Sequence, residues 1–119
     1  MHTAAAGPAK VRRLKKRSEF LRAARGQRVG RSAFSVQTVG RDAPEAGIGF
    51  TVTKQQGNSP QRNRIRRRLR EAARFCAADF LPQHDYVLVG RREALSLPFD
   101  RLTADLLSGL RKLHSRKPS

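Results

Sequence analysis

Six arginines stand within residues 62–70, and no Asp or Glu interrupts the chain over residues 47–69. The apolar residues here recur every three or four positions, at Ile65, Leu69, Ala72, Cys76 and Phe80. That period predicts an amphipathic helix, which Ser59 would cap and Pro60 would begin. One side of the helix then faces a core, and the other side carries almost only positive charge.

A solvated surface is the ordinary explanation of a charge run, but here the signs of the charges argue against it. Surface helices usually pair Glu with Arg or Lys, whereas Glu71 alone does so here, and like charges at helical spacing repel by about 0.2–0.5 kcal/mol per pair. The whole chain shares this bias, because its 119 residues include 26 Lys and Arg against 9 Asp and Glu, a net charge of +17. Since the arginine fork grips phosphate bidentately, the sequence favours a nucleic acid as partner.

The composition excludes several classes of protein. No apolar run approaches the ~18 residues of a membrane span, and the first nine residues lack the features of a secretory signal, although the absence of acids before Glu19 leaves an organellar presequence open. Cys76 is the only cysteine, so no internal disulfide can form, and a cytoplasmic location is the simplest interpretation. Because His2, His84 and His114 are scattered, we expect no metal site.

The remaining pattern predicts one small α+β domain. A short helix is expected around residues 18–24, and a last helix follows Pro98 with the apolar stripe Phe99, Leu102, Leu106, Leu110 and Leu113. Alternating residues predict strands at 33–39 and 48–54, which the turn at 40–47 would join as a hairpin. A brief strand at 28–30 and a buried strand at 86–89 complete the set.

These elements follow the order helix, strands, helix, strand, helix, which is typical of a two-layer α+β sandwich. We expect a mobile basic tail over residues 1–12, a single domain over 13–114 and a C-terminal tail over 115–119. Phe34, Phe50, Phe75, Phe80 and Phe99 are expected in the core.

At the basic helix the sequence resembles the bacterial ribonuclease P protein component, a small basic subunit of the ribonucleoprotein that removes the 5′ leader of precursor tRNA. The resemblance covers roughly residues 13–113. It rests on Arg62-Asn63-Arg64-Ile65-Arg66-Arg67 with Arg70, on Ile48 to Lys54 and Gly57-Asn58, on Arg13-Leu14-Lys15-Lys16 with Phe20, and on Asp85 to Val89.

The resemblance implies helix, three strands, helix, strand, helix, a fold similar to a domain of a ribosomal small-subunit protein. It also implies a left-handed β-α-β crossover, although about 98% of such connections are right-handed. The family places the catalytic centre in the RNA subunit with its Mg²⁺ ions. We therefore expect no catalytic residue and no cofactor bound by this chain alone, and endonuclease activity only in the holoenzyme.

The same resemblance implies the site residues. The RNA-binding set is Lys15, Lys16, Lys54, Arg62, Asn63, Arg64, Arg66, Arg67 and Arg70. Phe20 and Gln37 would line a cleft for the single-stranded 5′ leader, in which a ring can stack on a base. Family members often carry aromatic residues where Ala23 or Ala24 and Gln37 stand here, so charge and hydrogen bonds would contribute more to leader binding.

The expected partners are therefore ribonuclease P RNA and the precursor tRNA leader, with no membrane and no required protein partner. A ribosomal or other structural RNA-binding protein is the main alternative, because composition, size and fold would all accommodate it. A DNA-binding protein is a third possibility, although its recognition helix would need exposed Asn or Gln flanked by fewer arginines.

Overall fold

The structure is a computed structural model that describes residues 11–115. Five strands form one sheet in the order β1-β4-β5-β3-β2. The strands are β1 (Val11–Arg13), β2 (Gln27–Gly30), β3 (Phe34–Gly40), β4 (Ala46–Thr51) and β5 (His84–Gly90). The helices are α1 (Arg17–Ala24), α2 (Ser59–Phe75) and α3 (Phe99–Ser115), with the 3-10 turns η1 (Lys54–Gln56), η2 (Ala77–Asp79) and η3 (Arg92–Leu95).

The expected hairpin between β3 and β4 is wrong, because β5 lies between these two strands. It pairs antiparallel with β3 and parallel with β4, where Ile48 is opposite Tyr86. Tyr86, Val87 and Leu88 are almost completely buried, as a central strand covered on both faces requires. The hairpin of this fold is instead β2–β3, in which Val29 is opposite Val36.

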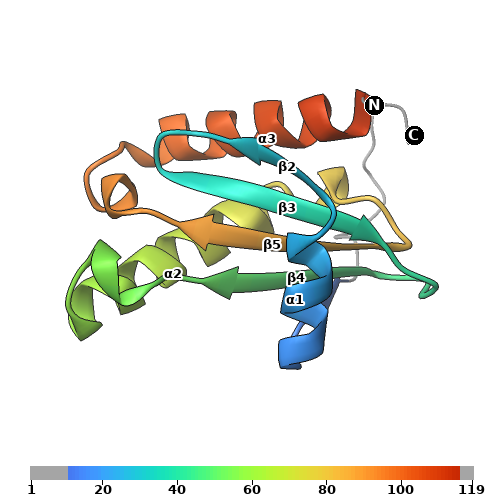
Figure 1. The fold of residues 1–119 in the computed structure, drawn as a ribbon. Helices are drawn as coiled ribbons and strands as arrows, with labels where there is room; N and C mark the ends of the chain where they lie inside the picture. The colour runs from blue at the N-terminus through green and yellow to red at the C-terminus, as the bar shows by residue number, and fades with distance from the viewer. Residues whose placement is uncertain (1–10, 116–119) are drawn as a thin grey trace.

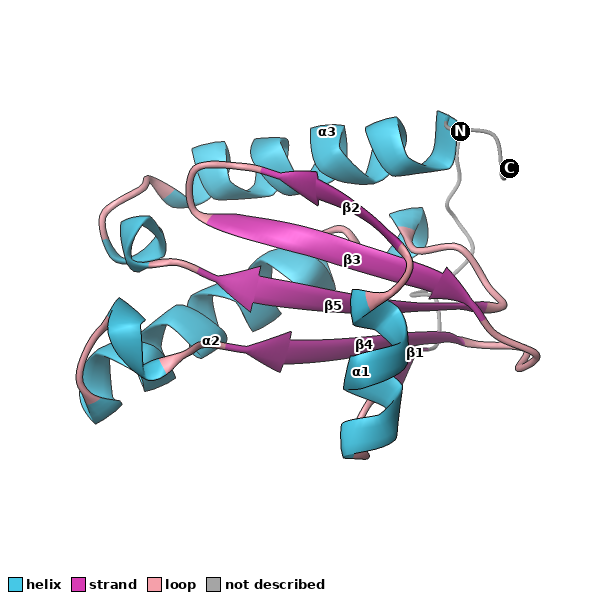
Figure 2. Cartoon of the chain, viewed as in Figure 1, coloured by secondary structure: helices cyan, strands magenta, loops and turns pink. Residues whose placement is uncertain are grey.

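The sheet carries helices on both faces (Figure 1). In that view α1 crosses in front of the sheet, α2 lies behind it and α3 runs along the top, and the helices in cyan enclose the strands in magenta in Figure 2. Because β4 and β5 are parallel neighbours and α2 passes behind them, the β4-α2-β5 crossover is left-handed, as the resemblance implied. The two-layer sandwich consists of the sheet with α2 and α3, and α1 covers part of the opposite face.

The main core lies between the sheet and the two long helices. Ile65 and Leu69 of α2 and Leu102, Leu106 and Leu110 of α3 have no exposed surface. These residues belong to the apolar stripes that the sequence predicts, so the period located both helices. The predicted stripe runs on to Phe80, however, whereas α2 ends at Phe75 and the chain continues into η2.

The phenylalanines divide between core and surface. Phe34 and Phe80 are buried and Phe50 is partly buried, but Phe75 is 75% exposed and Phe99 is 38% exposed, so their expected core positions are wrong. The reason is that α2 ends at Phe75, on the side of the helix away from Ile65 and Leu69. There the two rings pack edge to face, with centroids 6.4 Å apart.

The first strand lies earlier in the chain than the sequence predicts. Val11 and Arg12, which we assigned to the tail, belong to β1, where Val11 is opposite Ala46 of β4 in a parallel pair. The rest of the predicted tail, residues 1–10, lies outside the described residues, as do residues 116–119. Ser115, assigned to the C-terminal tail, is instead the last residue of α3. A three-residue strand has no readable period, so its pairing partner had to identify it.

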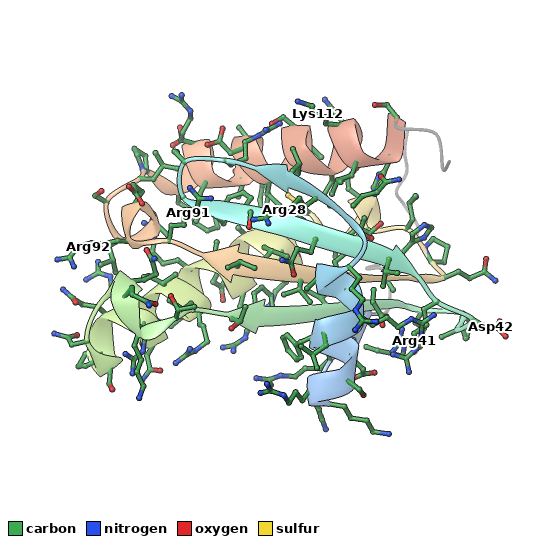
Figure 3. The ribbon with its side chains drawn as sticks, viewed as in Figure 1. Arg28, Arg41, Asp42, Arg91, Arg92 and Lys112 are labelled. Atoms are coloured by element: carbon green, nitrogen blue, oxygen red, sulfur yellow. The ribbon has the colours of Figure 1, made fainter. Side chains whose placement is uncertain are left out.

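Charged side chains project from every side of the domain (Figure 3). Arg91 and Arg92 lie at the end of the sheet near the start of α2, Arg41 and Asp42 at the opposite end, and Lys112 on α3. The labelled charged residues therefore lie at both ends of the sheet and on α3.

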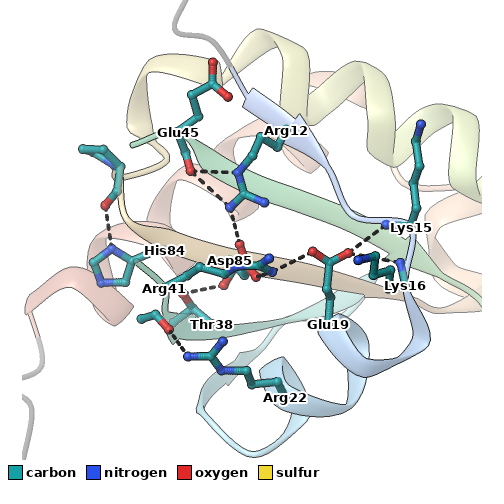
Figure 4. A network of polar contacts seen from close by, with 12 residues as sticks. Arg12, Lys15, Lys16, Glu19, Arg22, Thr38, Arg41, Glu45, His84 and Asp85 are labelled. Carbon is teal, nitrogen blue, oxygen red and sulfur yellow. Dashed lines mark hydrogen bonds and ion pairs between the residues drawn. The ribbon is translucent and has the colours of Figure 1, made fainter. Parts of the chain in front are cut away.

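Asp85 on β5 is the exception, because it is a fully buried charge (Figure 4). Its two carboxylate oxygens accept from Arg12 at 2.7 Å and from Arg41 at 2.9 Å. Arg41 also donates to Glu19 at 2.6 Å, and Glu19 accepts the backbone N–H groups of Lys15 and Lys16 at 3.1 Å. This network, which we call the Asp85 network, joins β1, the start of α1, the β3–β4 connection and the central strand.

The network makes stability depend on acid pH. The backbone N–H of Lys16, with contributions from Arg41 and Lys15, lowers the pKa of Glu19 from 4.5 to about 2 against the opposing effect of burial. A carboxylate whose pKa is lower in the folded state stabilises the fold above its unfolded pKa, and this contribution is lost as pH falls from 4.5 towards 2. In thermal unfolding across this range, Glu19→Gln should therefore flatten the pH dependence of Tm relative to the unaltered chain.

Glu93→Gln is the matched control, because Glu93 is an exposed acid on η3. It should leave the steepness of the curve unchanged. Equal slopes for Glu19→Gln and the unaltered chain would contradict the role given to Glu19.

Candidate nucleic-acid interface

The outer face of α2 is built from its arginines. Asn58 caps the helix by accepting the N–H of Gln61 at 3.0 Å, and the Gln61 side chain accepts the N–H of Asn58 at 2.9 Å. The cap is thus one residue before the Ser59 that the sequence predicts. With Ile65 and Leu69 against the core, the helix presents its exposed polar side chains outward: Asn63, Arg64, Arg67, Glu71 and Arg74.

Some residues of the predicted RNA-binding set are held by the protein itself. Arg62 donates to the carbonyl of Gly57 at 3.0 Å and to the hydroxyl of Ser59 at 3.1 Å, so it fastens the turn before α2. Arg66 donates to the side-chain oxygen of Asn63 at 2.7 Å, which orients two members of the set on one helical turn. Outside the set, Arg68 donates to the carbonyl of Ala94 on η3.

The turn before α2 requires glycine at position 57. Its φ is +149°, and a Cβ there would come within 2.6 Å of the Gln61 side-chain oxygen. Lys54, on the exposed side of η1, stands directly before this turn. The predicted lysine therefore lies close in sequence to the arginine face.

Two arginines that the sequence analysis left out lie at the same end. The backbone N–H of Arg92 donates to the Gln56 side chain of η1 at 2.8 Å, which draws η3 against η1. Arg91 and Arg92 are exposed beside the start of α2 (Figure 3). Only the tertiary contact brings residues 91 and 92 to the motif, so no local signal could have found them.

Arg70 forms the flank of α2 that faces the sheet. It is half-buried, and its guanidinium lies 5.7 Å from the centre of the Phe50 ring on β4. A cation over an aromatic face is held in place without losing its charge. The arginine face therefore continues from the outside of α2 down to the edge of the sheet.

A cleft of about 470 Å³ lies on the other side of the sheet, between α1 and the strands. It brings together Phe20 and Gln37, the two residues predicted for a leader-binding cleft, and Lys15 also lines it. Its lining residues are Lys15, Arg17, Phe20, Leu21, Ala24, Gln37, Phe50, Thr51, Val87 and Val89. Lys16 does not line the cleft and is exposed where α1 begins.

Phe20 is half-buried because its ring lies against β4. A Cβ at Gly49 would stand 2.7 Å from the ring, so only glycine lets Phe20 rest on the strand. Of the two alanines that replace expected aromatics, Ala23 is completely buried, whereas Ala24 lines the cleft. Of these two positions, position 24 is therefore the one at which an aromatic side chain would line the cleft.

The ionisable groups of the interior offer little chemistry. Burial raises the pKa of the Cys76 thiol to about 11, which leaves it protonated near neutrality. Both carboxylate oxygens of Asp85 are occupied by arginines. Within residues 11–115, no three His, Cys, Asp or Glu side chains form a group that could hold a metal ion.

None of the helices in the same range has the length and apolar character needed to cross a membrane.

These features define a class, the small basic α+β proteins with an arginine-rich helix on one side of a sheet and a cleft on the other. The family model described as Ribonuclease P matches residues 9–114. The chain belongs to this ribonuclease P protein family.

Curated relatives carry the name ribonuclease P protein component. That of Ruegeria pomeroyi is 52% identical over 110 residues and covers 88% of each chain. That of Gluconacetobacter diazotrophicus is 47% identical, over 87% of this chain and 91% of its own.

Solved structures share the fold. The chain resembles the ribonuclease P protein of Staphylococcus aureus with a TM-score of 0.73 and 25% identity, over 87% of this chain and 96% of that one. The Thermotoga maritima protein gives the same TM-score of 0.73 at 22% identity, over 84% and 96% of the two chains.

The exposed arginines of α2 generate a prediction. Replacing Arg64, Arg66 and Arg67 together with Ala should weaken RNA binding strongly and leave the fold intact, because these side chains lie outside the core. If each made one phosphate contact, the slope of log K against log salt should flatten by about 2–3 units in total. Binding titrations over a salt series, with circular dichroism, measure both quantities.

The matched control removes three exposed cations of α3, Arg101, Arg111 and Lys112, and changes the net charge equally. It should affect binding and the salt slope much less. An equal loss in both variants would mean that binding follows overall charge and not the α2 face.

Phe20 generates a second prediction. Phe20→Ala should lower the affinity of the holoenzyme for leader-bearing precursor tRNA by a factor that corresponds to about 1–3 kcal/mol of stacking. Because the ring is only half-buried, the loss of folding stability should be smaller than the ~3–5 kcal/mol of a core ring. Substrate affinity and thermal melting are measured side by side.

Phe20→Leu is the control, since it keeps an apolar contact with Gly49 and removes the ring. It should melt near the unaltered chain and still bind the leader weakly. Normal leader affinity in Phe20→Leu would show that Phe20 contributes packing alone.

Proposed function

We propose that this chain is the protein subunit of ribonuclease P, which binds the catalytic RNA subunit and the 5′ leader of precursor tRNA and so promotes 5′ maturation of tRNA. The observation that carries the proposal is the acid-poor arginine face of α2 on one side of the sheet, with a cleft lined by Phe20 on the other. Two RNA strands then have two separate surfaces to bind.

The α2 face suits a folded RNA. Arg64 and Arg67 are exposed and Arg66 is held in place by Asn63, so the face combines solvent-exposed guanidinium groups with one that the protein orients. Phosphate contacts of this kind release condensed cations and depend strongly on salt. A chain with a net charge of +17 would relieve the repulsion between two RNA backbones that must approach each other.

The cleft suits a single strand. Phe20 offers a stacking surface, Gln37 a hydrogen-bonding group, and Lys15 and Arg17 positive charge at the side of α1. Single-stranded nucleic acid is held by this combination of rings and cations with little dependence on sequence. Because mature tRNA lacks the leader, such a cleft would favour precursor over product and would speed product release.

The chemistry of cleavage would belong to the RNA subunit. The proposal assigns the Mg²⁺ ions of the holoenzyme to RNA, because the Asp85 carboxylate is engaged by two arginines and the Cys76 thiol stays protonated. The chain would act in the cytoplasm with ribonuclease P RNA and precursor tRNA, and without a further protein.

Reconstitution tests the proposal against a structural RNA-binding role. The full chain is added to ribonuclease P RNA across a Mg²⁺ series, with precursors whose leaders are progressively shortened. We expect the chain to stimulate cleavage most at low Mg²⁺ and with long leaders, because it replaces screening cations and holds the leader.

Stimulation that is independent of both Mg²⁺ and leader length would refute the mechanism. RNA binding without any stimulation would favour the structural role. Cleavage by the RNA-free chain after rigorous nuclease removal would contradict the assignment of the catalytic centre to RNA.

A further inference from the structure

We propose that a second pocket, between β1 and α2, binds one unstacked RNA base together with its adjacent phosphate. The inference rests on the proposed function, since it assumes that α2 lies against RNA. The pocket has a volume of about 260 Å³. Its lining residues are Val11, Arg12, Arg13, Ile48, Phe50, Arg70, Ala73, Arg74 and Ala77.

The pocket exists because small residues stand where α2 passes the edge of the sheet. Ala73 and Ala77 form the helical wall, and β4 contributes Ile48 and Phe50. Val11 on β1 remains 43% exposed beside it. Five of the nine lining side chains are therefore apolar, and they form a surface that a planar, weakly polar group can cover.

The remaining four lining residues are all arginines, so the polar groups of the pocket are all cationic. Arg12 is engaged by Asp85, and its charge is largely compensated. Arg13 is exposed, and Arg74 has only an exposed pair with Glu71 at 3.2 Å, which is weak. Arg70 lies over Phe50. The arginines at 13, 70 and 74 are thus available to an anion at the pocket.

A nucleotide matches this combination of apolar surface and positive charge better than a phosphate or a base alone. A free phosphate would leave the five apolar side chains uncovered, and an uncharged aromatic group would bring no anion to the three arginines. In RNA recognition, splayed bases stack on aromatic rings and on arginine planes while cations hold the neighbouring phosphate. Phe50 and Arg70 provide such a pair at one side of the pocket.

The position also agrees with the path of RNA along α2. Arg70 and Arg74 belong both to the helix and to the pocket, so a strand on the α2 face would pass its opening. Phe50 borders this pocket and the cleft beside α1. The pocket is therefore continuous with both surfaces of the proposed function, since it shares Arg70 with the α2 face and Phe50 with the cleft.

The first experiment uses the full chain with three probes: AMP, adenosine and inorganic phosphate. The methyl groups of Val11 and Ile48 are observed by NMR during each titration. AMP should shift both signals at concentrations at which adenosine and phosphate shift them much less. Equal shifts with phosphate alone, or none with AMP, would overturn the proposal.

The second experiment fills the pocket. Ala73→Leu and Ala77→Leu add bulk inside it without removing any charge, and Ala78→Leu adds the same bulk at an exposed position of η2 outside the lining. Affinity for ribonuclease P RNA should fall about 5- to 150-fold in the pocket variants, as loss of one stacked base implies, and stay unchanged in Ala78→Leu. Thermal melting checks the fold, and Ala77→Leu replaces Ala73→Leu if the more buried position does not tolerate leucine.

The triple alanine variant of Arg64, Arg66 and Arg67 distinguishes a failure of the pocket proposal from a failure of the proposed function. Normal RNA affinity in the folded pocket variants, with strong loss in the arginine variant, would overturn the pocket and leave the proposed function standing. Unchanged affinity in the arginine variant would instead refute the proposed function itself.

Discussion

The buried carboxylate of Asp85 is the interaction on which the arrangement of this domain depends. A charge inside a sheet is tolerated only when it is fully paired, and here Arg12 and Arg41 bind its two oxygens from elements far apart in the chain. Arg41 then reaches Glu19 at the start of α1. The pairing therefore holds the edge strand β1 and the first helix in place against the central strand, and with them the walls of both the pocket and the cleft.

The same network explains how so basic a chain distributes its few acids. Asp85 and Glu19 are used inside the network, next to the cations that fix the N-terminal elements. On α2 only Glu71 faces the arginines, and it pairs with Arg74 on the surface. The helix consequently keeps an uncompensated field on its outer face, which a polyanion can neutralise. The paired charges of the Asp85 network and the exposed arginines of α2 therefore lie in different parts of the domain.

Long elements with a regular apolar period could be predicted from the sequence, whereas short elements and contacts between distant segments could not. Ile65 and Leu69, like the leucines of α3, located their helices because a 3.6-residue period persists over several turns. β3 and β4 were recognised as strands, but their alternation says nothing about neighbours, so the insertion of β5 between them was missed. Phe75 was assigned to the core from its residue type alone, although it lies off the apolar stripe of Ile65 and Leu69 and is exposed. Resemblance to a family supplied the candidate site. The positions of Arg91 and Arg92 beside α2, and the pocket between β1 and α2, became visible only in the tertiary structure.

By itself the sequence determined the class of protein: a small α+β domain whose central helix has a core face and an arginine face, with a charge that requires an anionic partner. These properties are local or additive, because periodicity and net charge do not depend on how elements meet. The tertiary structure alone decided the strand order, the burial of Asp85, and the pocket and the cleft that β4 borders. Each of these depends on which side chains meet across the sheet, and such contacts between distant residues leave no periodic trace in the chain.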